Sequence, residues 1–392
     1  MVPTRVLLTG AGGFVGGRVA HRIALGETEE LTALLHTPAG PGAMRLARLP
    51  VDIEVGSVLD KELLERLLAD CDAIVNCAFG MGKTSEDGTR TLLEAAAAAD
   101  IESFVHLSSA VVHGHHLDGT LHESAPFAPD DEYGEWKRKG EEVIAAFEGG
   151  AAPDPAIIRP MIVYGPHDDW VTGALETVRT GAVLAEGGIG TLNQIYIDNL
   201  VDVILLAMRE PAAKGETFLA VDDDHVTWRQ FYRDVGSILA EHPPFQELSR
   251  REIRLRKRAN TVRDSVVPPV KAVGGMVTAD EAQENAVAEL ARTPWAVPLV
   301  KQVPQPVRER LLDRVIGDGS NGQPVKLERT NGSDKSRSPQ YELPEERFVR
   351  MQSSLGSVSN EKSKDLLGWE QRVAYEKGME YVGKWLAYDG RL

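Results

Sequence analysis

Three residues near the middle of the chain have side chains that could pass a proton to and from a substrate oxygen. Tyr133 and Lys137 are four residues apart in a segment with a helical pattern, so both side chains lie on one helix face. A free phenol has a pKa near ~10, too high for a base at neutral pH, but a lysine ammonium one turn away favours the phenolate. We therefore interpret Tyr133 as a general acid and base whose phenolate form is favoured by Lys137.

Ser109 is the third residue, and it follows an apolar run over residues 103–107 that predicts a buried strand. Catalytic groups of parallel α/β proteins lie at the carboxyl ends of the strands. From that position the Ser109 hydroxyl can hydrogen-bond the substrate oxygen whose proton Tyr133 takes or returns.

The elements that position these residues also predict a second ligand, at the amino-terminal end of the chain. The segment Thr9-Gly10-Ala11-Gly12-Gly13-Phe14-Val15-Gly16 joins an apolar run to a helical pattern. Gly10 permits a tight turn, Gly13 lets the backbone approach a pyrophosphate, and Gly16 lets the helix lie close to the sheet. Amides at the helix start then face the phosphates, so the segment predicts a dinucleotide site.

Apolar runs and helical patterns alternate through the first half of the chain. The runs fall at residues 5–9, 31–35, 51–56, 73–78 and 103–107, with helical stretches at 15–25, 60–68 and 89–99 and a later strand at 218–221. This alternation predicts a Rossmann-type α/β fold, a doubly wound parallel sheet with helices on both faces.

Length and composition limit the class of protein. The 392 residues exceed what one core usually organises, so we expect a smaller C-terminal substrate lobe beside the nucleotide-binding domain. A formal net charge of -16 disfavours binding to nucleic acid or to an anionic membrane. Cys71 and Cys77, the two cysteines, predict buried thiols in a reducing compartment. The sequence shows no signal segment or spanning run, and we expect a cytoplasmic protein.

The glycine segment, Ser109 and the Tyr133–Lys137 pair occur in an order typical of one family. With Glu141 and with the segment Arg159-Pro160-Met161-Ile162-Val163-Tyr164-Gly165-Pro166, they resemble the extended short-chain dehydrogenase/reductases, the NAD-dependent epimerase/dehydratase family. The likeness covers about residues 4–240 and resumes at 358–386. It implies an enzyme that transfers hydride with NAD or NADP, with Ser109, Tyr133 and Lys137 as the catalytic residues.

The resemblance also implies how the chain is divided. Residues 1–165, completed by about 193–222, are expected to form the NAD(P)-binding Rossmann domain. Residues 166–192 and 223–392 are expected to form the substrate lobe, with an atypical insertion at about 242–355. The insertion has a basic run, helical pieces expected at 279–291 and 306–315, and a polar segment at 317–339 that predicts a flexible loop.

The family likeness places a set of residues at the cofactor. They are Gly10, Gly13, Phe14, Val15, Gly16, His36, Ser57, Val58, Cys77, Ala78, Phe79, Tyr133, Lys137, Pro160 and Ile162. His36 follows the second strand, where a carboxylate would bind the ribose 2′-hydroxyl and a basic residue would accommodate a 2′-phosphate. Ser57 replaces the family's usual aspartate near the adenine, and Arg45 is interpreted as a solvated surface residue. We therefore expect a chain able to use either NAD or NADP.

Substrate contacts are expected from Ser109, Val111, His113 and Tyr133, with a small-molecule, sugar-linked substrate. His113 stands where the family commonly has a tyrosine beside the substrate. Ala110 and Val111 follow Ser109 in place of the acidic pair of the dehydratases, which favours reversible hydride transfer over elimination of water. The neighbouring histidines have no cysteine ligands nearby, and we expect no metal site.

Three functions stay open from the sequence. The first is an epimerase or oxidoreductase acting on a sugar, in particular a nucleotide-linked sugar; the second is a ketone or sterol-type reductase; the third is a non-catalytic, cofactor-sensing regulator. Leu192 stands where the sugar epimerases often have an arginine that binds the diphosphate. Arginines of the run over residues 250–258, such as Arg254 and Arg256, could replace it, or the run could be a solvated helix face or a membrane contact. The resemblance also leaves room for a homodimer through helices such as 89–99 and 133–147.

Overall fold

A computed structural model describes residues 4–26, 28–99, 101–147, 154–181, 183–239, 245–258 and 343–391. The chain divides into two units, one formed by residues 1–250 with 341–392 and the other by residues 251–340. The fold described below is that of the first unit. The helices expected at 279–291 and 306–315 and the polar segment at 317–339 lie outside the described residues.

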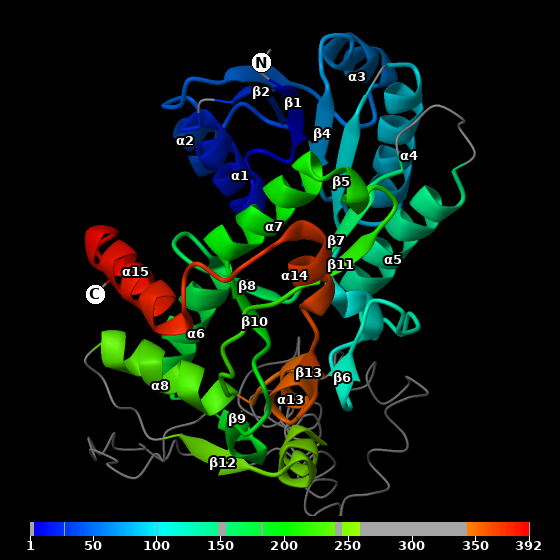
Figure 1. Ribbon diagram of the computed structural model, residues 1–392. Helices are drawn as coiled ribbons and strands as arrows, with labels where there is room; N and C mark the ends of the chain where they lie inside the picture. Colours follow the sequence, from blue (N-terminus) through cyan, green and yellow to red (C-terminus); the bar gives the residue numbers. More distant parts are fainter. Residues whose placement is uncertain are drawn as a thin grey trace, which may run out of the picture. The chain divides into compact units, whose positions relative to one another are not determined.

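A seven-stranded sheet, parallel at every pairing, forms the centre of the first unit (Figure 1). Its strands are β1 (Thr4–Thr9), β2 (Glu29–Leu35), β3 (Asp52–Val55), β4 (Ala73–Asn76), β5 (Ser103–Leu107), β7 (Ala156–Pro160) and β11 (Thr217–Ala220), in the spatial order β11-β7-β5-β4-β1-β2-β3. The order reverses between β1 and β4, and ligands of such sheets bind at the carboxyl ends of the strands at this point. The predicted Rossmann-type fold is confirmed.

Helices cover both faces of the sheet (Figure 1). One face carries α1 (Phe14–Ala24), α2 (Pro41–Leu46) and α7 (Ile197–Arg209), and the other carries α3 (Lys61–Leu68), α4 (Lys83–Ala97) and α5 (Glu132–Ala145). Alternation along β1 explains why its sequence is apolar throughout. Val6 and Leu8 pack in the core with α1 and α7, whereas Leu7 packs in the core with α3 and α4.

A second core lies among the elements that extend from the sheet. It gathers α6 (Asp169–Thr180), α8 (Trp228–Ile238), α13 (Glu346–Gln352) and α15 (Tyr375–Tyr388), with the fully buried Trp228 among aromatic neighbours. Three short parallel pairs accompany it: β8 (Ile162–Tyr164) with β10 (Gln194–Tyr196), β9 (Val183–Ala185) with β12 (Gln246–Leu248), and β6 (Thr120–Leu121) with β13 (Ser357–Val358). Further short helices are η1 (Ala110–His113), η2 (Glu186–Gly188), η3 (Pro211–Ala213) and α14 (Glu361–Leu367), and residues 250–258 are also helical.

The fourth helix begins earlier than its sequence predicts. The alanine-rich pattern predicts a helix over 89–99, but α4 starts at Lys83 and includes Gly88. A Cβ at Gly88 would lie 2.8 Å from Cγ2 of Val58, so the glycine lets the helix pack closely against the segment after β3. Close packing therefore outweighs the low helix propensity of glycine at this position.

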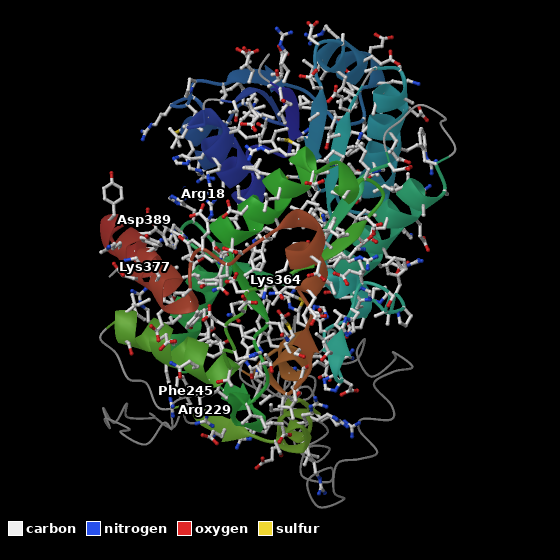
Figure 2. All side chains as sticks on the ribbon, in the orientation of Figure 1. Arg18, Arg229, Phe245, Lys364, Lys377 and Asp389 are labelled. Carbon is white, nitrogen blue, oxygen red and sulfur yellow. The ribbon has the colours of Figure 1, made fainter. Side chains whose placement is uncertain are left out.

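Paired charges join α1 to α7. Arg18, labelled in Figure 2, donates from Nε and Nη2 to the two carboxylate oxygens of Asp198, at 2.6 and 2.8 Å. This bidentate, half-buried contact fixes the helix that carries the glycine segment against the sheet-covering α7. Within the described ranges, none of the helices combines the length and the apolar character needed to cross a bilayer.

Candidate active site

The turn between β1 and α1 is built by backbone atoms that approach one another closely. Gly10 has φ +69°, and a Cβ there would lie 2.5 Å from the carbonyl carbon of Cys77. A Cβ at Gly16 would lie 2.3 Å from the carbonyl oxygen of Gly10, which accepts a hydrogen bond from the Gly13 amide at 3.0 Å. Only glycine fits at Gly10 and Gly16, so these residues suit the cradle that a dinucleotide cofactor needs.

A buried asparagine ties the glycine turn to the strands beside it. Thr9 donates from Oγ1 to Asn76 Oδ1 at 2.6 Å, and the Ala78 amide donates to the same oxygen at 3.1 Å. The Asn76 amide nitrogen lies 3.1 Å from Nδ1 of His106 in β5. Burial lowers the pKa of His106 to about 3, so its ring is neutral and can accept this bond. Asn76 and His106 hold three strand ends in register, a role that their sequence positions do not reveal.

The ends of β2 and β3, where the adenine half of a cofactor is expected, lie close to the same turn. Leu35, the last residue of β2, places Cδ2 3.1 Å from the position of a Cβ on Gly12, and the exposed His36 follows it. The Gly56 amide donates to the Leu35 carbonyl at 2.8 Å, which brings the half-buried Ser57 alongside. The structure therefore brings His36 and Ser57 to the edge of the cradle.

The remaining expected cofactor residues lie at strand and helix ends. Phe14 and Val15 form the first turn of α1 and are half-buried, whereas Pro160 ends β7 and Ile162 begins β8. Their contacts with a cofactor stay predictions. Arg45 is half-buried, and its Nη2 lies 4.0 Å from the position of a Cβ on Gly17, so its assignment as a solvated surface residue stays a prediction.

The three residues that could move a proton meet at the end of β5. Asp131 caps α5 by accepting from the Gly134 amide at 2.7 Å, which places Tyr133 and Lys137 on one face. The Ser109 hydroxyl and the Tyr133 phenol are hydrogen-bonded, and Lys137 donates from Nζ to the Leu107 carbonyl at 2.8 Å. The sequence-predicted Ser109, Tyr133 and Lys137 are therefore neighbours in the structure.

Phe79 connects this group to the cradle. Its ring packs edge-on against the Tyr133 ring, with 5.1 Å between centroids, and the Lys137 ammonium lies 5.1 Å from the Phe79 centroid. Cys77, whose backbone abuts Gly10, lies two residues before Phe79 and is close enough to Lys137 to interact with its charge. The proton-moving side chains and the glycine turn therefore belong to one site.

Burial shifts the pKa values of both Tyr133 and Lys137. Burial raises the pKa of Tyr133, and the hydrogen bond with Ser109 opposes this increase. Burial also lowers the pKa of Lys137 to about 8, although Cys77 and Glu141 act to raise it. In the free protein Lys137 is bonded to the Leu107 carbonyl, and the expected stabilisation of the phenolate by Lys137 stays a prediction.

A buried ion pair lies beneath these residues. Glu141, on the α5 face of Tyr133 and Lys137, accepts from Arg159 Nη2 at 2.5 Å and from Nε at 3.0 Å, and both side chains are almost fully buried. Glu141 also accepts a hydrogen bond from the Ser108 hydroxyl. Arg159 further donates from Nη1 to Nε2 of His113 and to the Glu123 carbonyl, each at 3.1 Å. Ser108 and Arg159 are site residues that could not be recognised from the sequence. The four-residue spacing of Tyr133, Lys137 and Glu141 did indicate that these three lie on one face of a helix.

His113 is enclosed by this network. Its exposed fraction is 7%, Nδ1 lies 3.0 Å from the Pro126 carbonyl and Nε2 faces Arg159. Because the arginine can only donate, this pattern assigns the neutral tautomer with the proton on Nδ1. Burial, aided by the charge of Arg159, lowers the pKa of His113 and keeps the ring neutral. Both ring nitrogens are engaged within the protein, so the expected substrate contact stays a prediction while the geometry favours a supporting role.

A surface pocket lies between the loop after His113 and the second core. His116, Asp118, Glu186, Arg250, Ser353 and Leu355 line it. Arg250 donates from Nε to the Ser353 hydroxyl at 2.7 Å, its backbone amide donates to Glu186 at 2.7 Å, and Nη2 lies 3.4 Å from Nδ1 of His116. The first arginine of the basic run therefore faces a pocket. Arg254 and Arg256 belong to the second unit, and their expected role stays a prediction.

Two sequence features near the pocket have structural explanations. Leu192 stands where the sugar epimerases often have an arginine. It is buried in the second core, so an arginine at this position would carry a buried charge. His115, one of the clustered histidines, is paired with Asp130 at 2.5 Å. Across the described ranges, no three histidine, cysteine, aspartate or glutamate side chains lie together in a way that could hold a metal ion.

Comparison with known proteins identifies a family for most of this site. Residues 6–220, more than half of the chain, match the NAD dependent epimerase/dehydratase family. A UDP-glucose 4-epimerase of Vibrio cholerae is 28% identical over 269 residues, which cover 62% of this chain and 78% of the relative. An N-acetyl-alpha-D-glucosaminyl-diphospho-ditrans,octacis-undecaprenol 4-epimerase of Escherichia coli O157:H7 is 27% identical over 261 residues, covering 62% and 75%.

Solved structures agree in fold. A UDP-glucose 4-epimerase of Thermotoga maritima, solved with UDP-glucose, has a TM-score of 0.65 at 16% identity and covers 98% of this chain and 99% of its own. A dTDP-glucose 4,6-dehydratase of Streptomyces venezuelae, solved with NAD, has a TM-score of 0.63 at 18% identity and covers 98% of each chain. At these identities the likeness establishes the fold alone.

Proposed function

The chain belongs to the NAD dependent epimerase/dehydratase family, and we propose that it is a nucleotide-sugar epimerase or oxidoreductase in which Ser109, Tyr133 and Lys137 act on the reacting hydroxyl. The observation that carries this proposal is the meeting of these three side chains at the end of β5, beside the glycine turn. Family membership makes the chain an NAD(P)-dependent enzyme, and the side chains define its proton chemistry.

The glycine turn and its neighbours would hold the cofactor. Gly10, Gly13 and Gly16 would allow the close backbone approach, and the first amides of α1 would bind the phosphates. When bound there, the nicotinamide supplies a hydride acceptor and donor. Lys137 would bind the ribose hydroxyls, because its Nζ lies at the β5 end beside the cradle and its bond to the Leu107 carbonyl leaves two further N–H donors.

Tyr133 and Ser109 would handle the substrate hydroxyl. The Ser109 hydroxyl already bonds the phenol, so a substrate oxygen that bonds both groups is held where Tyr133 can take its proton. In the complex with cofactor, the Lys137 ammonium would favour the phenolate of Tyr133, whose pKa burial raises in the free protein. If the hydride then returned to the opposite face of the same carbon while Tyr133 returned the proton to the oxygen, the sugar would be epimerised. If the ketone were released instead, the substrate would be oxidised and the cofactor left reduced.

The pocket at Arg250 supports a phosphate-bearing substrate. Ser353 and His116 hold Nε and Nη2 of Arg250 and so orient the guanidinium in the pocket, where its remaining N–H donors could bond a phosphate oxygen. The relatives are named as enzymes of nucleotide- or diphosphate-linked sugars, which agrees with this chemistry. We place the substrate lobe at residues 166–192 and 223–392, as the sequence predicts, and a homodimer through α4 and α5 is part of the same proposal.

The test uses the full chain with UDP-glucose and UDP-N-acetylglucosamine. Sugar configuration is followed by proton NMR while the nicotinamide fluorescence reports the redox state of the bound cofactor. Change at the sugar carbon without net reduction of the cofactor supports an epimerase, and stoichiometric reduction supports an oxidoreductase. Reduction of simple or sterol-type ketones, with no response to either nucleotide sugar, would overturn the proposal in favour of the reductase alternative.

A second experiment examines the phosphate contact. Arg250→Gln should raise the KM for a nucleotide sugar by roughly tenfold while cofactor affinity is unchanged, because one charge-assisted contact is lost. Arg66→Gln is the matched control, since Arg66 is exposed, is paired with Glu54 of the edge strand β3 and does not line the pocket. An unchanged KM in Arg250→Gln would remove the pocket from the proposal.

A further inference from the structure

The segment from Leu107 to His113 carries the Ser109 hydroxyl, and side chains from other elements hold it along its length. Lys137 bonds the Leu107 carbonyl at 2.8 Å, and Glu141 accepts from the Ser108 hydroxyl. Arg159 bonds Nε2 of His113 at 3.1 Å at the far end of η1. A short segment is thus held on both sides of the catalytic serine.

The groups that hold this segment share one buried charge pair. Glu141 comes from α5 and Arg159 from β7, and their exposed side-chain fractions are 3% and 6%. The carboxylate accepts from Ser108 and Arg159, and the guanidinium also donates to His113 and the Glu123 carbonyl. Every strong acceptor of this pair has a donor, so the pair can stay ionised at depth.

Aromatic contacts complete the enclosure of the guanidinium. The Phe127 centroid lies 5.1 Å from the Arg159 guanidinium carbon, and the Phe127 ring stacks on His113 at 6.1 Å between centroids. Phe127 belongs to the loop that returns from η1 to α5, and the Ala128 amide donates to the Val112 carbonyl at 2.8 Å. The loop therefore covers the charge pair and is hydrogen-bonded to η1.

We infer that Glu141 and Arg159, acting through Ser108 and His113, are positioning residues that set the place of the Ser109 hydroxyl against Tyr133. His113 contributes as a neutral acceptor for Arg159, so its imidazole supports the loop and does not bind substrate. This inference deepens the proposed function and rests on it for the role of Ser109. Its structural content, the ordering of the 107–114 segment, can be measured without any substrate.

The first experiment removes one hydroxyl at the edge of the network. Ser108→Ala deletes the donor to Glu141 and keeps the buried charge pair, so the protein retains its fold. Hydrogen exchange, read by mass spectrometry over residues 107–114, should become faster, because the Val111 amide bonds Ser109 Oγ and the Gly114 amide bonds the Val111 carbonyl. Unchanged exchange in this segment overturns the inference.

The matched control removes a buried hydroxyl elsewhere. Ser363 lies in α14, is fully buried and donates to the Leu219 carbonyl at 3.2 Å. Ser363→Ala should leave exchange over residues 107–114 as in the unmodified protein. If both variants accelerate exchange in that segment equally, the effect is a general loss of stability and the inference is wrong.

Kinetic measurements distinguish a role in positioning Ser109 from a role in stability alone. In Ser108→Ala, kcat should fall by roughly tenfold with cofactor Kd unchanged, because a small displacement of a catalytic group lowers the rate strongly. The acid limb of the kcat profile should move to higher pH, in the same direction as in Ser109→Ala, since the hydrogen bond from Ser109 lowers the pKa of Tyr133. Faster exchange with an unshifted profile would overturn the positioning role and leave the proposed function intact.

A second pair of variants tests His113. Gln can place an amide oxygen where Nε2 accepts, so His113→Gln should retain most of kcat and normal exchange. His113→Leu removes the acceptor and should behave like Ser108→Ala, with KM unchanged. A raised KM in both variants with unchanged exchange would instead make His113 a substrate contact, as first expected from the sequence, and would refute its supporting role.

Discussion

The carboxyl ends of β1 and β4 and those of β5 and β7 build adjoining parts of one site in different ways. At the ends of β1 and β4 the important contacts are between backbone atoms, such as those of Gly10, Gly16 and Cys77. At the ends of β5 and β7 they are between side chains, with Glu141 and Arg159 at the centre. The part made of backbone tolerates most side-chain chemistry and no added Cβ, whereas the part made of side chains depends on complete sets of partners.

The largest expected effect comes from breaking the buried pair. Arg159→Met leaves the Glu141 carboxylate buried and unpaired, and should lower the free energy of unfolding by about 3–5 kcal/mol. Urea unfolding followed by circular dichroism measures this change. Arg66→Met, which breaks an exposed pair with Glu54, should change it by less than about 1 kcal/mol.

A double variant sharpens the same prediction. In Arg159→Met/Glu141→Leu both charges are gone, so much of the lost stability should return. Activity should not return with it, because the double variant restores packing without restoring the bonds to Ser108 and His113. If stability and activity both returned, the buried pair would be needed only to fill space. The side chains at the ends of β5 and β7 would then not differ from the backbone cradle in the way described above.

The next effect is on chemistry alone. Tyr133→Phe should lower turnover by ~10²-fold or more, because it removes the proton carrier while keeping the ring that packs on Phe79. Cofactor Kd, measured by fluorescence, should be unchanged. Lys137→Met is the companion variant, and it should impair both turnover and cofactor binding since Lys137 is assigned to both. Near-normal turnover of Tyr133→Phe would contradict the catalytic assignment.

The glycine turn between β1 and α1 is tested by adding one methyl group at Gly10. Gly10→Ala should weaken cofactor binding by at least about tenfold, because an alanine at φ +69° is strained by ~1–2 kcal/mol and its Cβ meets the Cys77 carbonyl. Gly368→Ala provides the control, since Gly368 has φ +62° with open space around the position of a Cβ. Equal losses of cofactor affinity would mean that backbone strain, and not close approach, governs the cradle.

The smallest expected effect concerns the choice of cofactor. His36→Asp should shift the ratio of NAD to NADP affinity roughly fivefold toward NAD, because a carboxylate accepts from the 2′-hydroxyl and repels a 2′-phosphate. His36→Asn, which adds no charge, should move the ratio less. An unchanged ratio in His36→Asp would mean that this exposed side chain does not reach the ribose.

The sequence was sufficient for the parts of the site that depend on local spacing. The glycine turn, the strand before Ser109 and the helix that places Tyr133 beside Lys137 each follow from residues close together in the chain. The family match over residues 6–220 confirms the fold and the class of enzyme that these patterns predicted.

The rest of the site depends on contacts between distant elements. Arg159 is an ordinary strand residue in the sequence, and only the packing of α5 on β7 places it against Glu141. Burial, which raises the pKa of Tyr133, cannot be read from the Tyr-Lys spacing. Arg250 also differs from its neighbours Arg254 and Arg256 only in where the fold places it.

The pairing of β6 with β13 has a consequence for the order in which the chain can mature. Thr120 and Ser357, whose hydroxyls lie 3.0 Å apart, are separated by 237 residues, and the Leu117 amide likewise bonds the Ser354 hydroxyl at 2.8 Å. During synthesis on the ribosome, the loop that follows η1 must therefore wait for residues 354–358 before these bonds can form. The glycine turn and its strands are synthesised far earlier, so a nascent chain can form that turn long before the loop after η1 is fixed.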